Sequence, residues 1–137
     1  MGIDATIETE QGSCLAELVD THDLVNWLLS LATLDSTVCL RFIDPYGNTI
    51  FNGLQIPVLQ SECSALALQL TEPNLLEGKR VYLERAGAWP KVAFEEAQKN
   101  IETLSLSELR NHLEALLRLF SDAIEKGPHH YVRFIGD

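Results

Sequence analysis

The stretch SLSELRNHLEALLRLFSDAIEKGPHHYVRFI, residues 105–135, joins a helix signal to a strand signal and decides the fold class. It opens with a capping box, in which the Ser105 hydroxyl and the Glu108 side chain are expected to satisfy backbone N–H groups at a helix start. Gly127 and Pro128 end that helix, and residues 130–135 follow as a strand. The helix carries an apolar stripe at helical spacing: Leu109, Leu113, Leu116, Phe120 and Ile124.

A second clear pattern lies at residues 37–52, where TVCLRFI, DPYG and NTIFN follow one another. Aspartate, proline and glycine at the first, second and fourth positions of DPYG suit a type I turn. Proline presets φ, and aspartate accepts a local backbone hydrogen bond. We therefore predict a β-hairpin over residues 37–52.

The other segments complete the predicted fold. Strands are expected at 3–8, at 13–18 with weaker support, and at 79–85, the part that the pattern defines least well. Helices are expected at 21–33, 56–70 and 90–104, in addition to the helix that starts at Ser105. Together these predict a single α+β domain over residues 1–137. Its mostly antiparallel sheet of about four strands includes the hairpin 37–52 and a C-terminal strand 130–135, packed by about four helices.

Length, composition and charge support one hydrophobic core and limit the choice of partner. The chain has 137 residues, of which 46% are hydrophobic and 22% charged, values close to the averages of globular domains. Its formal charge of −10 disfavours nucleic acids and anionic membranes as partners and favours a basic protein or a cation. An acidic surface also keeps a small protein in solution, so both interpretations stay open.

The cysteines and the N-terminal residues indicate a cytoplasmic protein. Cys14, Cys39 and Cys63 are odd in number, far apart and include no C-x-x-C pair, so neither a disulfide framework nor a zinc site is expected. The first residues contain no basic region followed by an apolar stretch, and no segment approaches the ~20 apolar residues of a membrane span. We therefore expect no signal peptide and no membrane anchoring.

Two of the predicted strands contain the same tripeptide, Arg-Phe-Ile, at residues 41–43 and 133–135. Alternation along a strand places one set of side chains on a buried face and leaves a second face of mixed chemistry. A face that combines tyrosine, isoleucine and arginine resembles the cores of protein–protein interfaces. The alternative is that helices cover this face too and that acids at its rim pair with the arginines. The interaction candidates are Arg41, Ile43, Tyr131, Arg133 and Ile135.

The sequence contains no recognisable catalytic or cofactor motif. There is no G-x-S-x-G, no H-E-x-x-H, no glycine-rich phosphate loop and no kinase motif set, so we lean against an enzyme and expect no cofactor. His129 and His130 are neighbours that would point to opposite faces of a strand, while His22 and His112 stand alone. We expect all four to be packed or solvated histidines rather than metal ligands.

The segment LRFIDPYGNTIFNGLQIPVL, residues 40–59, taken with HYVRFIGD, residues 130–137, resembles small uncharacterised bacterial proteins. Some proteins of this kind are encoded on mobile integron gene cassettes. The resemblance implies a small bacterial accessory protein, often a homo-oligomer, and it brings no catalytic residues with it.

Three hypotheses about function follow. The leading one is a non-catalytic binding protein that forms a homodimer, through the face with Arg41 and Arg133 or through an apolar helix surface. The second is an immunity-type or antitoxin-like protein that neutralises a basic toxin by charge complementarity. The third is a small-molecule binder whose pocket, between sheet and helices, is lined by tryptophan and tyrosine side chains.

Overall fold

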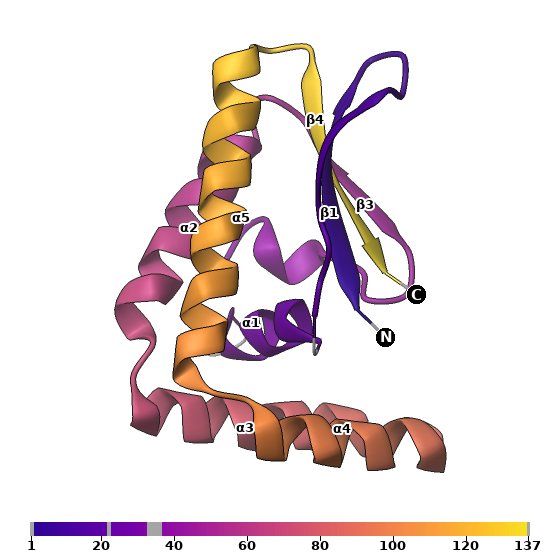
Figure 1. Ribbon diagram of the computed structural model, residues 1–137, viewed down its shortest axis with the longest axis vertical. Coiled ribbons are helices and arrows are strands. Elements are labelled where there is room, and N and C mark those ends of the chain that lie inside the picture. Colours follow the sequence, from indigo (N-terminus) through magenta and orange to yellow (C-terminus); the bar gives the residue numbers. More distant parts are fainter. Residues whose placement is uncertain (1, 22, 33–36, 137) are drawn as a thin grey trace.

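The first and last strands of the chain lie side by side at the centre of one sheet (Figure 1). The computed structural model describes residues 2–21, 23–32 and 37–136. Strand β1 (Ile3–Thr9) pairs with β4 (His130–Gly136), and β2 (Cys14–Leu18) and β3 (Asn48–Phe51) flank this central pair. The strand order is β2-β1-β4-β3, with every neighbouring pair antiparallel.

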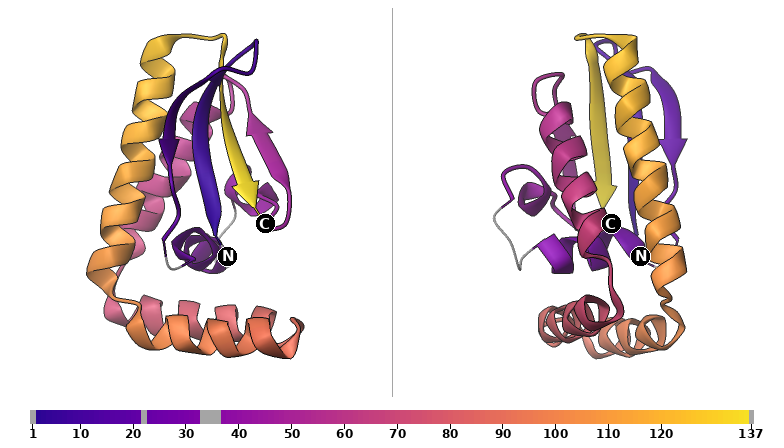
Figure 2. Two further views of the ribbon diagram at one scale, coloured as in Figure 1. Left: turned by 45° about the vertical axis from the view of Figure 1, so that its right-hand side comes forward. Right: turned by 90° about the vertical axis from the view of Figure 1, so that its left-hand side faces the viewer.

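The helices lie on one side of the sheet and across one of its ends. Helices α2 and α5 run beside each other on one face of the sheet, while α3 and α4 form a layer across its lower end in Figures 1 and 2. Among the residues described, no helix is long and apolar enough to cross a membrane. The helices are α1 (Leu24–Ala32), the short 3-10 helix η1 (Leu40–Phe42), α2 (Ile56–Gln69), α3 (Glu72–Ala86), α4 (Lys91–Thr103) and α5 (Leu106–Lys126).

Alternation along the two central strands builds the core. Ile3, Ala5 and Ile7 of β1 and Val132 and Phe134 of β4 are all buried on the side that faces the helices. Burying such side chains is the main favourable contribution to folding. Helix α5 supplies the opposing stripe, whose buried members are Leu109, Leu113, Leu116, Phe120 and Ala123.

The two ends of α5 follow the sequence prediction. The Ser105 hydroxyl accepts a hydrogen bond from the backbone N–H of Glu108 at 3.1 Å, as in a capping box. At the other end, Gly127 has a φ of 102°, a value that side chains disfavour, and the chain turns there into β4. Ile124 differs from the predicted stripe because it is 42% exposed.

Helix α1 lies inside the molecule and has no solvent-facing side over residues 24–31, all of which are buried. Its Trp27 ring stacks on Tyr82 of α3, with ring centroids 4.3 Å apart and an angle of 17° between the planes. Trp89 meets Tyr82 edge-on at 5.8 Å. These aromatic contacts pack α3 against α1 and so join the layer of α3 and α4 to the core.

The predicted α+β class, the antiparallel sheet of four strands and the C-terminal strand are confirmed. The weakly supported strand at 13–18 is β2, and the helices predicted at 56–70 and 90–104 are α2 and α4. The helix predicted at 21–33 is α1, which begins at Leu24; His22 and Thr33 lie outside the described residues.

The hairpin predicted over 37–52 is wrong in its first strand, because residues 37–43 form η1 and its flanks. The Glu62 carboxylate on α2 accepts hydrogen bonds from consecutive backbone N–H groups of this segment. Its Oε1 accepts hydrogen bonds from Val38 and Cys39, both at 2.7 Å, and its Oε2 accepts from Leu40 at 3.3 Å. A carboxylate is stabilised by several amides that point at it from a helix start. Strand β3 therefore pairs with β4 and not with residues 37–43.

The turn between those segments is nevertheless present. The Asp44 side chain accepts a hydrogen bond from the N–H of Tyr46 at 2.9 Å, and its backbone carbonyl accepts from Gly47 at 3.4 Å. The Gly47 carbonyl in turn accepts from the N–H of Gly136 at 2.8 Å. The turn thus packs against the end of β4, where it leads the chain into β3.

The strand predicted at 79–85 is also wrong, since these residues belong to α3. The Thr71 hydroxyl caps this helix by accepting a hydrogen bond from the N–H of Asn74 at 3.4 Å, and Pro73 lies in the first turn. On the exposed side, Arg80 pairs with Glu77 and Glu84 one turn away in each direction. The alternating pattern predicted a strand, but as part of a helix the segment packs Tyr82 against Trp27.

We predict that Glu62→Ala destabilises the fold, because it leaves the amides at the start of η1 without their carboxylate acceptor. The expected loss in the free energy of unfolding is about 1–3 kcal/mol, measured by urea denaturation. Glu114→Ala, at an exposed position of α5, is the control and is expected to change stability by less than about 0.5 kcal/mol. Equal losses in the two variants would contradict the role given to Glu62.

Candidate functional site

The face of the sheet opposite α2 and α5 is left uncovered by the described helices, and it lies toward the viewer in the left view of Figure 2. We call it the open face. Strand pairing aligns Glu17, Thr6 and Arg133 in a row across β2, β1 and β4, and Ile50 of β3 completes this row. The other side chains of the central strands on this face are Asp4, Glu8, Tyr131 and Ile135.

A hydrogen-bonded cluster at the middle of the open face is centred on Glu8. Its Oε2 accepts from Arg133 Nε at 2.9 Å and from the Thr6 hydroxyl at 2.8 Å. These side chains cover Thr6, which is 4% exposed although it points away from the core. Arg133 of β4 and Glu8 of β1 thus form a cross-strand ion pair.

The structure brings together three of the five interaction candidates. Tyr131, Arg133 and Ile135 lie along β4 on the open face, and Ile135 is 39% exposed. Arg41 and Ile43 are not part of it, because residues 37–43 form no strand. Ile43 is buried in the core at 4% exposure, and Arg41 is exposed on η1. The strand beside β4 is β3 instead of residues 37–43, and its Ile50 lies next to Arg133 with 50% of its surface exposed.

The open face is acidic. Asp4, Glu8 and Glu17 on its strands and Glu10 in the β1–β2 turn are its acidic residues, against the single basic residue Arg133 among the strand residues described. Glu17 and Glu10 are exposed. A surface with an excess of one charge attracts partners of the opposite sign and repels copies of itself.

A second exposed group of side chains surrounds η1, and we call it the Arg41 patch. It consists of Val38, Arg41, Phe42 and Tyr46, of which Val38, Phe42 and Tyr46 are 65%, 62% and 58% exposed. The Arg41 guanidinium lies over the Phe42 ring, 5.0 Å from its centroid. Arginine beside exposed aromatic and apolar side chains is typical of contact surfaces.

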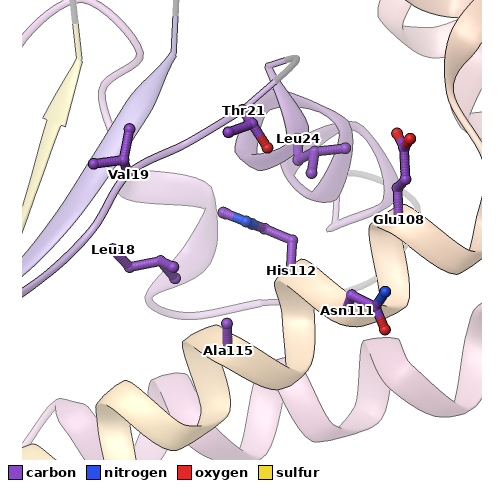
Figure 3. Close-up of a pocket in the computed structure, with 8 residues that line it drawn as sticks. All are labelled: Leu18, Val19, Thr21, Leu24, Glu108, Asn111, His112 and Ala115. Atoms are coloured by element: carbon purple, nitrogen blue, oxygen red, sulfur yellow. The ribbon is translucent and has the colours of Figure 1, made fainter.

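A hollow of about 400 Å³ separates the end of β2 and the start of α1 from α5 (Figure 3). Leu18, Val19 and Leu24 form apolar walls, and the imidazole of His112 projects from α5 between them. His112 is 7% exposed, and its Nε2 has no hydrogen-bond partner among the residues described. Burial lowers the pKa of His112, so the ring is neutral at pH 7.

Behind this hollow, the carboxylate of Asp20 links three elements. Its Oδ2 accepts from the N–H of Ile3 at the start of β1, and its Oδ1 accepts from the N–H of Leu24 at the start of α1, both at 2.9 Å. Oδ1 also lies 3.8 Å from Nε2 of His112 on α5. Burial raises the pKa of Asp20 to about 6, despite the amides that favour its charged form.

Asp23 is a second buried acid at the start of α1. It is 2% exposed and accepts from the Tyr82 hydroxyl at 2.6 Å and from Asn26 Nδ2 at 2.8 Å. Its φ of 59° is unusual for a residue other than glycine, although asparagine and aspartate tolerate it best. Burial raises the pKa of Asp23 to about 6.

These buried groups connect elements; they do not form a recognisable reaction centre. Among the residues described, no three His, Cys, Asp or Glu side chains are grouped in a way that could hold a metal ion. Trp27 and Tyr82, candidates to line a ligand pocket, stack in the core at 0% and 1% exposure. Sequence reasoning missed the approach of Asp20 to His112, because both had an ordinary local explanation as a helix-start acid and a lone histidine.

Comparison with known proteins adds no family or relative. No protein-family model, curated protein or solved structure matches the chain. The site must therefore be interpreted from its own geometry.

We predict that the stability of Asp23→Asn relative to wild type grows as the pH rises. The carboxyl group of Asp23 has a pKa of about 6 when folded and 3.8 ordinarily, so it contributes most stability below about pH 4 and loses that contribution as the pH rises through about 6. Asparagine accepts the positive φ, keeps one carbonyl oxygen as the acceptor for Tyr82 and stays neutral, while its amide nitrogen replaces the oxygen that accepts from Asn26, a loss that does not depend on pH. Its advantage over wild type should grow by roughly 2–3 kcal/mol between about pH 4 and pH 8.

Urea denaturation at a series of pH values measures this difference. Asp122→Asn removes an exposed acid of α5 and is the matched control, for which little pH-dependent gain is expected. A constant difference between Asp23→Asn and wild type across the pH range would contradict the assignment.

Proposed function

We propose that this chain is a non-catalytic interaction protein that binds a basic protein partner through the open face. The observation that carries the proposal is the uncovered antiparallel sheet face with its excess of acidic residues, centred on the Glu8–Arg133 pair. Exposed Ile50 and Ile135 flank that pair and supply apolar area. Apolar side chains give a docked partner affinity, and the charges speed its approach and select its sign.

A second copy of the chain fits the open face less well than a basic partner does. Two open faces brought together would place Glu10 and Glu17 of each copy near the acids of the other, and like charges that meet in an interface are costly. A basic toxin neutralised by this chain is one partner of the required chemistry.

We further propose the setting in which this interaction takes place. The resemblance of residues 40–59 and 130–137 to bacterial accessory proteins, some carried on mobile gene cassettes, supports a role as an accessory protein. The cysteines Cys14, Cys39 and Cys63 are free thiols, which supports action in the reducing cytoplasm.

A charge-reversal pair on the open face is expected to weaken binding of a basic probe. The probe is a blocked lysine- and arginine-rich peptide, titrated into isotopically labelled protein and followed by backbone amide chemical shifts. Glu10→Lys with Glu17→Lys should lower affinity by about tenfold more than Glu95→Lys with Glu102→Lys on α4, which changes net charge equally. The shifts should concentrate on the four strands, β1, β2, β3 and β4.

Two results would count against this function. Equal weakening by both pairs would mean that the probe responds only to net charge. Shifts spread evenly over the helices would mean that the open face is not a binding surface.

A homodimer built on the Arg41 patch is the second candidate, favoured by the exposed Phe42 ring under the Arg41 guanidinium. Sedimentation velocity should then show a concentration-dependent dimer that Phe42→Ser converts to monomer. Val92→Ser removes an exposed apolar side chain outside the Arg41 patch, 73% exposed on α4, and should leave the dimer intact. A monomeric wild-type chain at every concentration would refute this candidate.

A further inference from the structure

Two adjoining hollows form a groove along one end of the open face. The first, of about 340 Å³, lies between Ile50, Arg133 and Glu10. The second, of about 270 Å³, lies between Glu10, Leu54 and Pro128. Glu10 and Tyr131 line both hollows, so the two hollows adjoin at these side chains. We call this surface the Glu10 groove.

The middle of the Glu10 groove is suited to a cation. Glu10 lines both hollows, and its Oε1 lies 2.8 Å from Nδ1 of His129 in an exposed contact. Tyr131, half-buried on β4, lines the groove beside it. A carboxylate next to a tyrosine ring is a favourable setting for a guanidinium or ammonium group, which bonds to the acid and lies against the ring.

The two ends of the groove differ in chemistry. At one end, Glu8 is already occupied by Arg133 and Thr6, so the acid left to meet a cation in this part of the open face is Glu10, whose recorded partner is the exposed His129. At the other end, Leu54 is 87% exposed next to Pro128, in the segment that leads into α2. The groove therefore offers one position for a cation and an adjacent position for an apolar side chain.

We infer that the Glu10 groove receives an extended segment of the basic partner, with an arginine or lysine at Glu10 and Tyr131 and a nearby apolar side chain on Leu54 and Pro128. This inference rests on the proposed function. It specifies the part of the partner that is recognised as a short motif with one cationic and one apolar side chain. On an extended chain, residues two apart point to the same side, which gives such a motif the spacing of cation, any residue, apolar residue.

The net charge of the chain argues for this occupant over a second copy of the chain. The formal charge of −10 means that an approaching copy meets net repulsion, whereas a basic segment is attracted. An acidic or purely apolar segment would leave Glu10 facing either a like charge or no counter-charge.

Short blocked peptides separate the groove from the face as a whole. The probe has the sequence SRSLS, and its comparisons are SRSSS, SSSLS and SESLS, each titrated into labelled protein at low salt. We expect SRSLS to bind tightest and to shift the amides around Glu10, Leu54 and Tyr131. Glu10→Gln should weaken it by about fivefold or more, and Leu54→Ser should weaken SRSLS by a similar factor but leave SRSSS unchanged. Both substitutions are at exposed positions, so the amide spectrum should confirm an intact fold.

Glu17→Gln is the matched control, because it removes an acid of the open face that lies outside the groove. It should change the affinity for SRSLS by less than about twofold. Binding that depends equally on Glu10 and Glu17, or equal affinity for SRSLS and SRSSS, would overturn the groove and leave the open-face function standing. Failure of every arginine peptide to shift the open face would overturn both. Self-association that is lost in Glu10→Gln would assign the groove to a second copy instead.

Discussion

Seven residues of β1 pair with seven of β4, and this pairing sets both layers of the molecule. It joins segments from the two ends of the sequence, whereas the β1–β2 pair joins neighbouring segments. Strand alternation then sorts the side chains: Ile7 and Val132 point to the helices, while Glu8 and Arg133 point away. The hydrophobic core and the open face are two consequences of one register, because a slip by one residue would exchange them.

Acidic side chains perform three different tasks in this chain. Glu62 accepts backbone N–H groups at the start of η1, and Asp20 accepts those of Leu24 and Val25 at the start of α1, where negative charge is favoured. Asp23 joins α1 to Tyr82 of α3 inside the core. Glu10 and Glu17 remain at the surface. Part of the formal charge therefore supports the architecture, and the exposed part is what a partner would encounter.

The sequence predicted those parts of the fold that local rules control. The helix that starts at Ser105, the turn at Asp44–Gly47 and the closing strand each follow from neighbouring residues, and each is present. The segment 37–43 alternates like a strand, yet a carboxylate from α2 captures its amides, an interaction that no local pattern reveals. Residues 79–85 likewise form a helix in which Tyr82 stacks on Trp27, and this tertiary contact cannot be read from the local sequence.

The part of the candidate site that lies on β4 could likewise be predicted from local sequence, and the rest could not. Tyr131, Arg133 and Ile135 lie on the open face because β4 is a strand, which its own residues indicate. Arg41 and Ile43 were grouped with them only through the assumed hairpin, and they separate once that strand is absent. The acids that give the face its sign come from β1, β2 and their turn, and only the antiparallel order β2-β1-β4-β3 brings them beside Arg133.

Because the open face and the core use alternate residues of the same strands, the two can change independently. Substituting Glu17 or Ile50 alters what a partner contacts and leaves the buried positions of β1 and β4 intact. The exception is the cluster of Glu8, Thr6 and Arg133. Glu8 accepts from the buried Thr6 hydroxyl, so a substitution that removes Glu8 also lowers stability. The binding surface can therefore vary around this cluster, and the Glu10 groove borders the cluster at Arg133 while its Glu10 and Leu54 lie at exposed positions outside it.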